Sequence, residues 1–161
     1  LQPFVETAKE HNKGIFILVK TSNPASGEFQ DLICGEKKLY EIIAEKTHAW
    51  GKDFVGKKGY SAIGAVVGAT FPHEISALRK IMPMAYFLVP GYGAQGAAAK
   101  DIEYCFNSDG LGAIINASRS ILYAYNVSPW KEKYGICAWK EATQKAVITM
   151  NEEIRKISKS Y

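Results

Sequence analysis

The sequence predicts an α/β fold in which parallel strands alternate with helices. Apolar runs that lack strict polar alternation recur at 15–19, 62–68, 85–89 and 111–116, as expected for strands covered on both faces. Helical patterns, with an apolar residue at every third or fourth position, separate these runs. Because strand and helix alternate four times, we expect parallel strands joined by right-handed crossovers.

The helices are predicted in order along the chain. Residues 3–9 form an opening helix with Pro3 in its first turn, and Pro72 begins another helix in the same way. After the first, second and third strands the predicted helices span 35–54, 72–82 and 98–107. A polar turn follows the fourth strand, and a long helical tail then runs from residue 130, interrupted at Gly135.

Composition places the chain among globular proteins. Of 161 residues, 47% are apolar and 22% charged, which is typical of one folded domain with its own core. The net charge of +4 comes from scattered lysines, so we expect no nucleic-acid partner. No apolar run approaches the roughly 20 residues of a membrane span, and no leader opens the chain, so we expect a cytoplasmic protein without a membrane partner.

The cysteines and histidines predict neither a disulfide framework nor a metal site. The chain has three cysteines without a C-x-x-C pair and three histidines, and these residues share no ligand spacing.

Two architectures fit the alternation of strands and helices. One is an open doubly wound sheet, and the other is a (β/α)8 barrel, which takes about 250 residues. The barrel requires that roughly the first hundred residues lie outside this chain, and a start within a helix, without an initiator Met, fits that requirement. No linker divides the chain, so we expect residues 1–161 to belong to a single domain.

Polar groups follow the third and fourth strands, at the edge where parallel sheets bind ligands. Gly91, Gly93 and Gly96 would let backbone N–H groups approach an anion, and the next helix N-terminus would add its positive dipole end. Arg119 offers a fork of donors that matches phosphate oxygens, and Gln95 adds a neutral donor. A tight turn or an ion pair would explain either feature alone, but together they predict a phosphate site.

The same glycines have the G-x-G-x-x-G spacing of a dinucleotide-binding turn, which keeps an NADP-dependent oxidoreductase open as an alternative. However, no acidic residue ends the strand after the glycines, as the ribose of NAD would require. Arg119 would have to hold the 2′-phosphate of NADP from a turn that is itself built like an anion site.

Lys20 and Ser22, at the end of the first strand, are further candidates. A desolvated lysine can form a Schiff base or move a proton, although a rim lysine paired with a carboxylate explains Lys20 equally well. Ser22 and Asn23 can contact the polar edge of a small substrate or cap the turn before Pro24.

Taken together, four motifs resemble the last four βα units of orotidine 5′-monophosphate decarboxylases of the longer bacterial branch. They are LVKTSNPASGEFQDL (18–32), GAVVGATFP (64–72), LVPGYGAQG (88–96) and GAIINASRSILYAY (112–125), in the family's order and spacing. The resemblance implies a TIM barrel, usually a homodimer. It also implies an enzyme that converts orotidine 5′-monophosphate to uridine 5′-monophosphate in pyrimidine biosynthesis without metal or organic cofactor.

The resemblance also implies roles for individual residues. Ser22 resembles the residue that contacts the pyrimidine, and Gln95 the glutamine that grips the phosphate. Arg119, with the backbone around Ser118, resembles the phosphate-binding arginine after the last strand. Tyr92 departs from the small apolar residue often found in the glycine loop, and Lys20 belongs to this branch's motif although the family's proton donor lies elsewhere.

The family's catalytic motif, D-x-K-x-x-D, does not occur in these 161 residues. The resemblance therefore assigns no catalytic residue to this chain, and we expect the chain to be inactive alone. We expect it to associate with a missing N-terminal half, or with another copy of itself. A phosphate-binding module that never meets a catalytic half is the non-enzymatic alternative.

Overall fold

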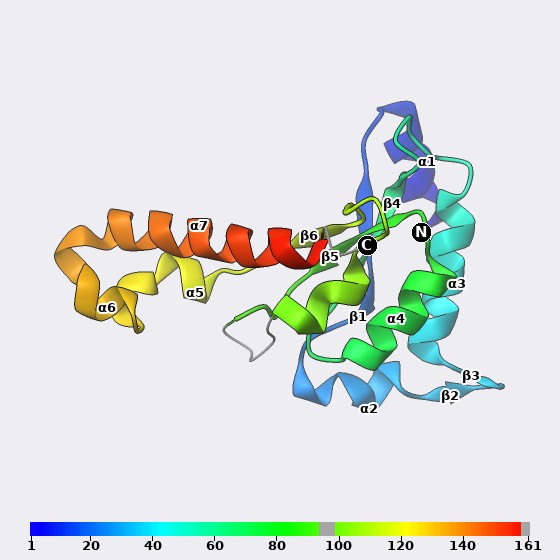
Figure 1. The fold of residues 1–161 in the computed structure, drawn as a ribbon. Coiled ribbons are helices and arrows are strands. Elements are labelled where there is room, and N and C mark those ends of the chain that lie inside the picture. The colour runs from blue at the N-terminus through cyan, green and yellow to red at the C-terminus, as the bar shows by residue number, and fades with distance from the viewer. Residues whose placement is uncertain (94–98, 159–161) are drawn as a thin grey trace.

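The computed structural model describes residues 1–93 and 99–158. In this part of the chain, parallel strands form a four-stranded sheet in the order β1-β4-β5-β6 (Figure 1). The strands are β1 (Ile15–Lys20), β4 (Ser61–Val67), β5 (Ala85–Val89) and β6 (Ala113–Ile115). Each lies where an apolar run predicted it, and the α/β class with a parallel sheet is confirmed.

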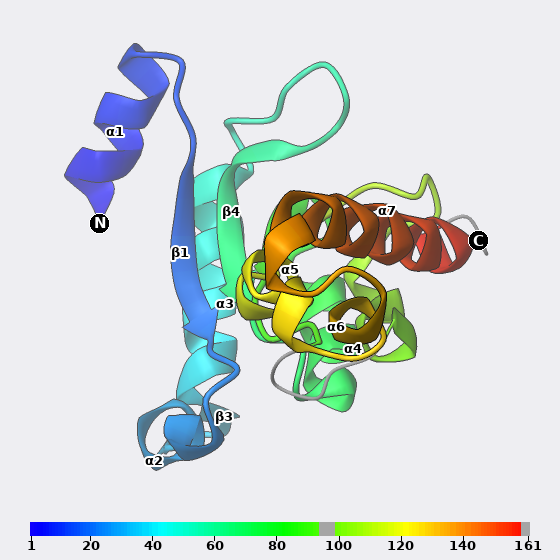
Figure 2. The same ribbon diagram turned by 90° about the vertical axis from the view of Figure 1, so that its left-hand side faces the viewer.

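Helices cover one face of this sheet. Helix α3 (Leu39–Gly51) packs against β1 and β4, and α4 (Pro72–Ile81) packs against α3 and against the 3₁₀ helix η2 (Ala99–Cys105) (Figures 1 and 2). The chain begins with α1 (Gln2–Glu10) and its described part ends with α7 (Trp139–Ser158). Among the described residues, no helix is both long enough and apolar enough to cross a bilayer.

Short elements complete the fold. Before α3 lie η1 (Pro24–Ser26), α2 (Gly27–Gln30), and the hairpin of β2 (Ile33–Cys34) and β3 (Lys37–Lys38). Between β6 and α7 lie α5 (Arg119–Leu122), η3 (Ala124–Asn126), α6 (Trp130–Lys133) and η4 (Ile136–Ala138). The predicted interruption of the helical tail is found at Gly135, whose φ is 60°.

Two predicted helices need correction. The helix predicted from residue 35 begins at Leu39, because Gly35 has a φ of 70° and turns the chain into the β2–β3 hairpin. The Lys38 N–H donates to the Glu41 carboxylate and so caps the first turn of α3. The segment predicted as a helix over 98–107 is a 3₁₀ helix in its described part, with a tighter turn and poorer hydrogen bonds than an α-helix.

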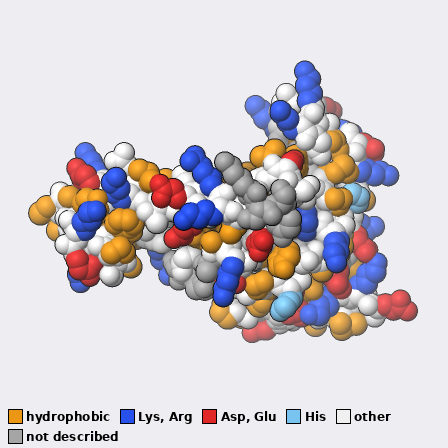
Figure 3. Space-filling view, in the orientation of Figure 1, with side chains coloured by type: hydrophobic (Ala, Val, Ile, Leu, Met, Phe, Trp, Pro, Cys, Tyr) orange, Lys and Arg blue, Asp and Glu red, His pale blue; other side chains and the backbone are white. Residues whose placement is uncertain are grey.

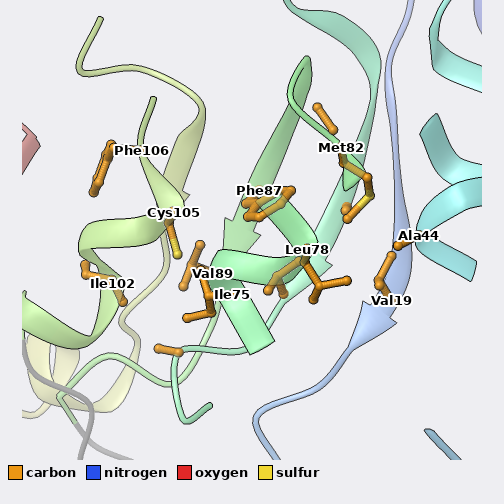
Figure 4. Packing of buried hydrophobic residues seen from close by; sticks show 14 of the residues in the cluster. Val19, Ala44, Ile75, Leu78, Met82, Phe87, Val89, Ile102, Cys105 and Phe106 are labelled. Atoms are coloured by element: carbon orange, nitrogen blue, oxygen red, sulfur yellow. The ribbon is translucent and has the colours of Figure 1, made fainter. Parts of the chain in front are cut away.

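The main hydrophobic core lies between the sheet and its helices. Phe87 and Val89 of β5 are fully buried against Ile75 and Leu78 of α4, and Ile102 of η2 closes the same core (Figure 4). Along β5 the side chains alternate between buried and partly exposed. The strand therefore has one face in this core and the other outside it.

Within the described chain, no helix covers the opposite face of the sheet, yet that face is apolar. Phe16, Leu18 and Ile114 are large side chains between 43% and 55% exposed. The Phe16 ring lies over Gly64 of the neighbouring strand, where a Cβ atom would come within 2.6 Å of it. Beside the free edge of β1, an apolar pocket of about 570 Å³ extends between α1 and α3. The sequence predicted a sheet covered on both faces. The described residues cover one face and leave the other exposed.

The segment from α5 to α7 forms an arm that extends away from the sheet (Figure 1). Its small core consists of Ala124, Ala142 and Ala146, packed against Tyr125, Trp130 and Tyr134. Large apolar side chains are exposed on this arm, as the space-filling view shows (Figure 3); they are Leu122, Tyr123, Val127, Ile136 and Trp139.

A buried arginine lies at the amino ends of the strands, at the edge of the sheet opposite to the glycine loop. The guanidinium of Arg79 lies 3.6 Å from the centre of the Phe87 ring. It donates hydrogen bonds of 2.6–3.0 Å to the backbone carbonyls of Met82, Ala85, Cys105 and Gly112. These carbonyls belong to the ends of α4 and η2 and to the starts of β5 and β6, so one side chain fixes four segments.

Candidate functional site

Backbone hydrogen bonds bring the carboxyl ends of the strands together. The Gly68 N–H, after β4, donates to the Lys20 carbonyl at 2.8 Å, and the Ala69 N–H donates to Pro90 at 2.9 Å. The Asn116 N–H, after β6, donates to Val89 at 2.9 Å. The predicted site residues at the ends of β1, β5 and β6 therefore share one edge of the sheet.

A small pocket lies between the ends of β5 and β6. Its volume is about 160 Å³, and it is lined by Pro90, Gly91, Tyr92, Asn116, Ala117, Ser118 and Arg119. Pockets for drug-sized ligands measure about 300 Å³ or more, so this one suits a single small group. Of the residues predicted to bind phosphate, Gly91, Ser118 and Arg119 therefore line one pocket.

Glycine is required in the turn after β5. Gly91 has a φ of 100° and Gly93 a φ of 72°, conformations that side chains with a Cβ rarely adopt. A Cβ on Gly93 would also come within 3.2 Å of the Ser120 hydroxyl, so the turn lies against the segment after β6. Gln95 and Gly96, the other predicted members of this loop, lie outside the described residues.

Arg119 is exposed at the rim of this pocket. Among the described residues, its guanidinium has no carboxylate partner and donates no hydrogen bond, which removes the ion-pair explanation within that part of the chain. Ser118, also exposed, precedes Arg119 at the start of α5. Helix α5 has only four residues, and the described helix after the glycine loop, η2, is a 3₁₀ helix that begins at Ala99.

Tyr92 joins the glycine loop to the C-terminal helix. Its side chain is buried, and its hydroxyl donates a hydrogen bond of 2.6 Å to the Glu153 carboxylate of α7. Burial raises the pKa of Tyr92 above its ordinary value, and the hydrogen bond to Glu153 raises this pKa further. Tyr92 is therefore a neutral hydrogen-bond donor that anchors the loop.

Ser22 lies at the end of β1, two strands from the pocket. It is 7% exposed, and its carbonyl accepts a hydrogen bond of 3.2 Å from the Thr70 hydroxyl. Gly68 lies so close that a Cβ there would come within 2.4 Å of the Ser22 nitrogen. Neighbouring strands are about 4.8 Å apart, so the ends of β1 and β5 are separated by about 10 Å.

The Lys20 side chain lies among the helices on the covered side of the sheet. It is 1% exposed, and its Nζ lies 2.8 Å from the Asp31 carboxylate and 3.5 Å from that of Glu74 on α4. The amine also lies about 5 Å above the rings of Tyr40 and Phe71. Lys20 is thus paired with carboxylates, which was one of the two interpretations that its sequence position allowed.

Sequence reasoning missed the residues that hold this edge in place. Asp31, Glu74, Thr70 and Glu153 each bind a predicted site residue. Asp31 and Thr70 lie within the motifs at 18–32 and 64–72, but neither has a predicted role, and Glu74 and Glu153 lie outside the four motifs. Their polar side chains look like ordinary exposed helix or loop positions, and only the tertiary fold brings them to the strand ends.

Comparison with known proteins identifies the family of this chain. The model of the Orotidine 5'-phosphate decarboxylase / HUMPS family matches residues 1–133. Orotidine 5'-phosphate decarboxylase of Caldicellulosiruptor bescii is 51% identical over 125 residues, which are 78% of this chain and 41% of that protein. The Rhodopirellula baltica protein of the same name is 42% identical over 159 residues, covering 96% of this chain and 51% of its own.

Solved structures give the same result. The structure of Leishmania donovani OMP decarboxylase superposes with a TM-score of 0.69 at 31% identity, covering 98% of this chain and 52% of that one. This chain therefore spans about half the length of the relatives that it matches. From the family match over residues 1–133 and these identities, the chain belongs to the Orotidine 5'-phosphate decarboxylase / HUMPS family.

Proposed function

We propose that these residues are the phosphate-binding half of an enzyme that decarboxylates orotidine 5′-monophosphate to uridine 5′-monophosphate. The observation that carries this proposal is the pocket between β5 and β6, where Arg119 faces solvent without a carboxylate partner among the described residues. Glycine backbone and an arginine fork are complementary to phosphate oxygens. Gln95, predicted to grip the same phosphate, stays part of the proposal.

The position of Ser22 supports a nucleotide as the ligand. With the phosphate between Gly91 and Arg119, the end of β1 lies about two strand spacings, or 10 Å, away. A ligand with a phosphate at one end and a polar ring at the other would extend along this edge. We therefore assign the pyrimidine contact to Ser22 and the phosphate contact to Ser118 and Arg119.

We propose that the complete enzyme is a (β/α)8 barrel of which residues 1–161 form the C-terminal half of one domain. The apolar sheet face with Phe16, Leu18 and Ile114 supports this, because such residues fill the interior of a closed barrel. The free edge of β1 and its apolar pocket would then receive the preceding unit. Below, "complete barrel" means these residues together with the four preceding units.

Catalysis would come from the half of the barrel that carries the D-x-K-x-x-D motif, which these 161 residues lack. A lysine there would protonate the developing carbanion, next to aspartates that favour loss of the substrate carboxylate. The phosphate grip contributes to the rate because binding energy from the non-reacting phosphate can position the reacting ring. From the resemblance we further propose a cytoplasmic homodimer of complete barrels.

Decarboxylation assays on the complete barrel and on the purified 161-residue chain test this proposal. We expect the complete barrel to release CO2 from orotidine 5′-monophosphate and the chain alone to release none. Titration with uridine 5′-monophosphate and with NADPH tests the alternative function, since only the first should bind. Activity of the isolated chain, or binding of NADPH in preference to the nucleotide, would contradict the proposal.

A further inference from the structure

The end of β1 contains an irregularity that sets the direction of Lys20. Leu18 pairs with Val66, but Lys20 pairs with Val67, so Val19 is an extra residue in the register. Leu18 lies on the exposed face of the sheet, whereas Val19 and Lys20 are both buried. Such a bulge changes the side to which the following residues point. It turns Lys20 towards the helices, not towards the face that carries Leu18.

The buried amine of Lys20 holds the bulge in this conformation. A buried ammonium is costly unless it is paired and hydrogen-bonded. Lys20 meets this requirement with Asp31, which follows α2, and with Glu74 in the first turn of α4. The Lys20 hydrogen bond is the main reason that the pKa of Asp31 falls below its ordinary value. Lys20 therefore joins the strand end to the residue after α2 and to α4.

A second contact fastens the same strand end. The Thr21 N–H donates to the Gln30 side-chain oxygen at 3.0 Å, so two contacts join the end of β1 and the residue after it to the end of α2 and the residue after that. On the other side, the Ser22 carbonyl accepts a hydrogen bond from the Thr70 hydroxyl, and Gly68 packs so closely that a Cβ there would come within 2.4 Å of the Ser22 nitrogen. Ser22 is thus held between the Lys20 contacts and β4.

We propose that Lys20 is a positioning residue: through its ion pairs with Asp31 and Glu74 it fixes the β1 bulge and thereby places Ser22 against the pyrimidine end of the ligand. The proposal rests on the proposed function. Lys20 does not touch the ligand, because its amine lies among carboxylates and aromatic rings on the helix side. Displacing a positioning group by about 1 Å can lower a rate up to a hundredfold, so a remote lysine can matter for binding and turnover.

The experiment is a double-mutant cycle between Lys20→Met and Ser22→Ala in the complete barrel. We expect Lys20→Met to weaken uridine 5′-monophosphate binding by about tenfold and to leave the affinity for ribose 5-phosphate, which lacks the pyrimidine, within about twofold. On the Ser22→Ala background, Lys20→Met should weaken nucleotide binding by less than about twofold, because its effect passes through Ser22. Lys20→Arg, which keeps the cation, should restore most of the affinity.

Lys38→Met is the matched control. Lys38 contacts the same two carboxylates at 3.5 and 4.0 Å, but it is 39% exposed and is not on β1. We expect it to change nucleotide affinity by less than about twofold. If Lys20→Met does not fold, Asp31→Asn carries the same cycle, since the Asp31 side chain is 36% exposed.

Additive effects of the two substitutions, or equal loss of nucleotide and ribose 5-phosphate binding, would overturn the positioning role. Unchanged nucleotide binding in Lys20→Met would overturn it as well. Failure of the proposed function is distinguishable, because the unsubstituted complete barrel would then neither bind uridine 5′-monophosphate nor decarboxylate its precursor.

Discussion

The Tyr92 hydroxyl donates a hydrogen bond of 2.6 Å to the Glu153 carboxylate, which links the turn after β5 to α7 across 61 positions of sequence. Both residues also line a pocket of about 430 Å³ between this turn and the α5–α7 arm. The aromatic residue in the glycine loop thus fastens the loop to the C-terminal helix, which accounts for a tyrosine where a small apolar residue is often found.

Replacing Tyr92 by Phe removes this hydrogen bond and keeps the ring. We expect the free energy of unfolding of the complete barrel to fall by about 2 kcal/mol, because a hydrogen bond to a charged group contributes about 1.5–3 kcal/mol. Denaturant titration measures the change, and the affinity for inorganic phosphate should fall with it. Tyr104→Phe, at a tyrosine that is 48% exposed, is the control. A Tyr92→Phe variant as stable as its parent would show that the contact to α7 does not hold the loop.

Gly91→Ala tests whether the turn proposed to bind phosphate depends on its backbone conformation. With a φ of 100°, an alanine there is strained, and the expected loss is about 1–3 kcal/mol of unfolding free energy together with weaker phosphate binding. Gly56→Ala is the control, because a Cβ at Gly56 meets only an ordinary contact at 3.7 Å. Equal stability of the two variants would mean that the turn adopts another conformation.

Arg79→Lys tests the arginine that joins four backbone segments. A lysine cannot reach all four carbonyls, and each buried carbonyl left unpaired costs about 1–3 kcal/mol. We expect the unfolding free energy to fall by about 3 kcal/mol or more, whereas Lys80→Ala at the exposed neighbouring position should change it by less than about 0.5 kcal/mol. A change of similar size in both variants would exclude a special role for Arg79.

The ion pair between Lys20 and Asp31 predicts a dependence of stability on pH. The pKa of Asp31 is lowered from 3.8 in the folded chain, so its ionised form stabilises the fold above the unfolded pKa, and this contribution is lost as pH falls through the folded value. The stability difference between the complete barrel and its Asp31→Asn variant should therefore be constant from neutral pH to about pH 5 and shrink below the unfolded pKa. Thermal unfolding followed from pH 7 to pH 2.5 measures it; a difference that grows in acid would contradict the assignment.

The strands were predictable because an apolar run in a parallel sheet is visible in the sequence itself. Residues 85–89, for example, form an apolar run between two predicted helices, and this run is β5 with the predicted bounds. The β2–β3 hairpin was missed because its strands have two residues each, too few for any periodicity. The start of α3 was placed too early for the same reason, since the hairpin occupies the residues before Leu39.

The site was predictable where it depends on strand ends and not where it depends on distant partners. The pocket brings Gly91 and Arg119 together because parallel strands end at one edge. The direction of Lys20 could not be predicted, because one extra residue in β1 turns it to the other side of the sheet. Arg79 could not be distinguished from Lys80 beside it, although the first is buried and the second exposed.

The most direct test of the phosphate site compares two substrates in the Arg119→Ala variant of the complete barrel. We expect kcat/KM for orotidine 5′-monophosphate to fall about a hundredfold or more, since in the proposed complex the arginine fork would make charged hydrogen bonds to the phosphate. In the same variant, kcat/KM for orotidine, which has no phosphate, should stay within about twofold of the parent value. Arg155→Ala, at an exposed position of α7, is the control, and it should change kcat/KM for either substrate by less than about twofold. An Arg119→Ala variant that loses activity equally on both substrates, or keeps it on both, would contradict the assignment of phosphate binding to the ends of β5 and β6.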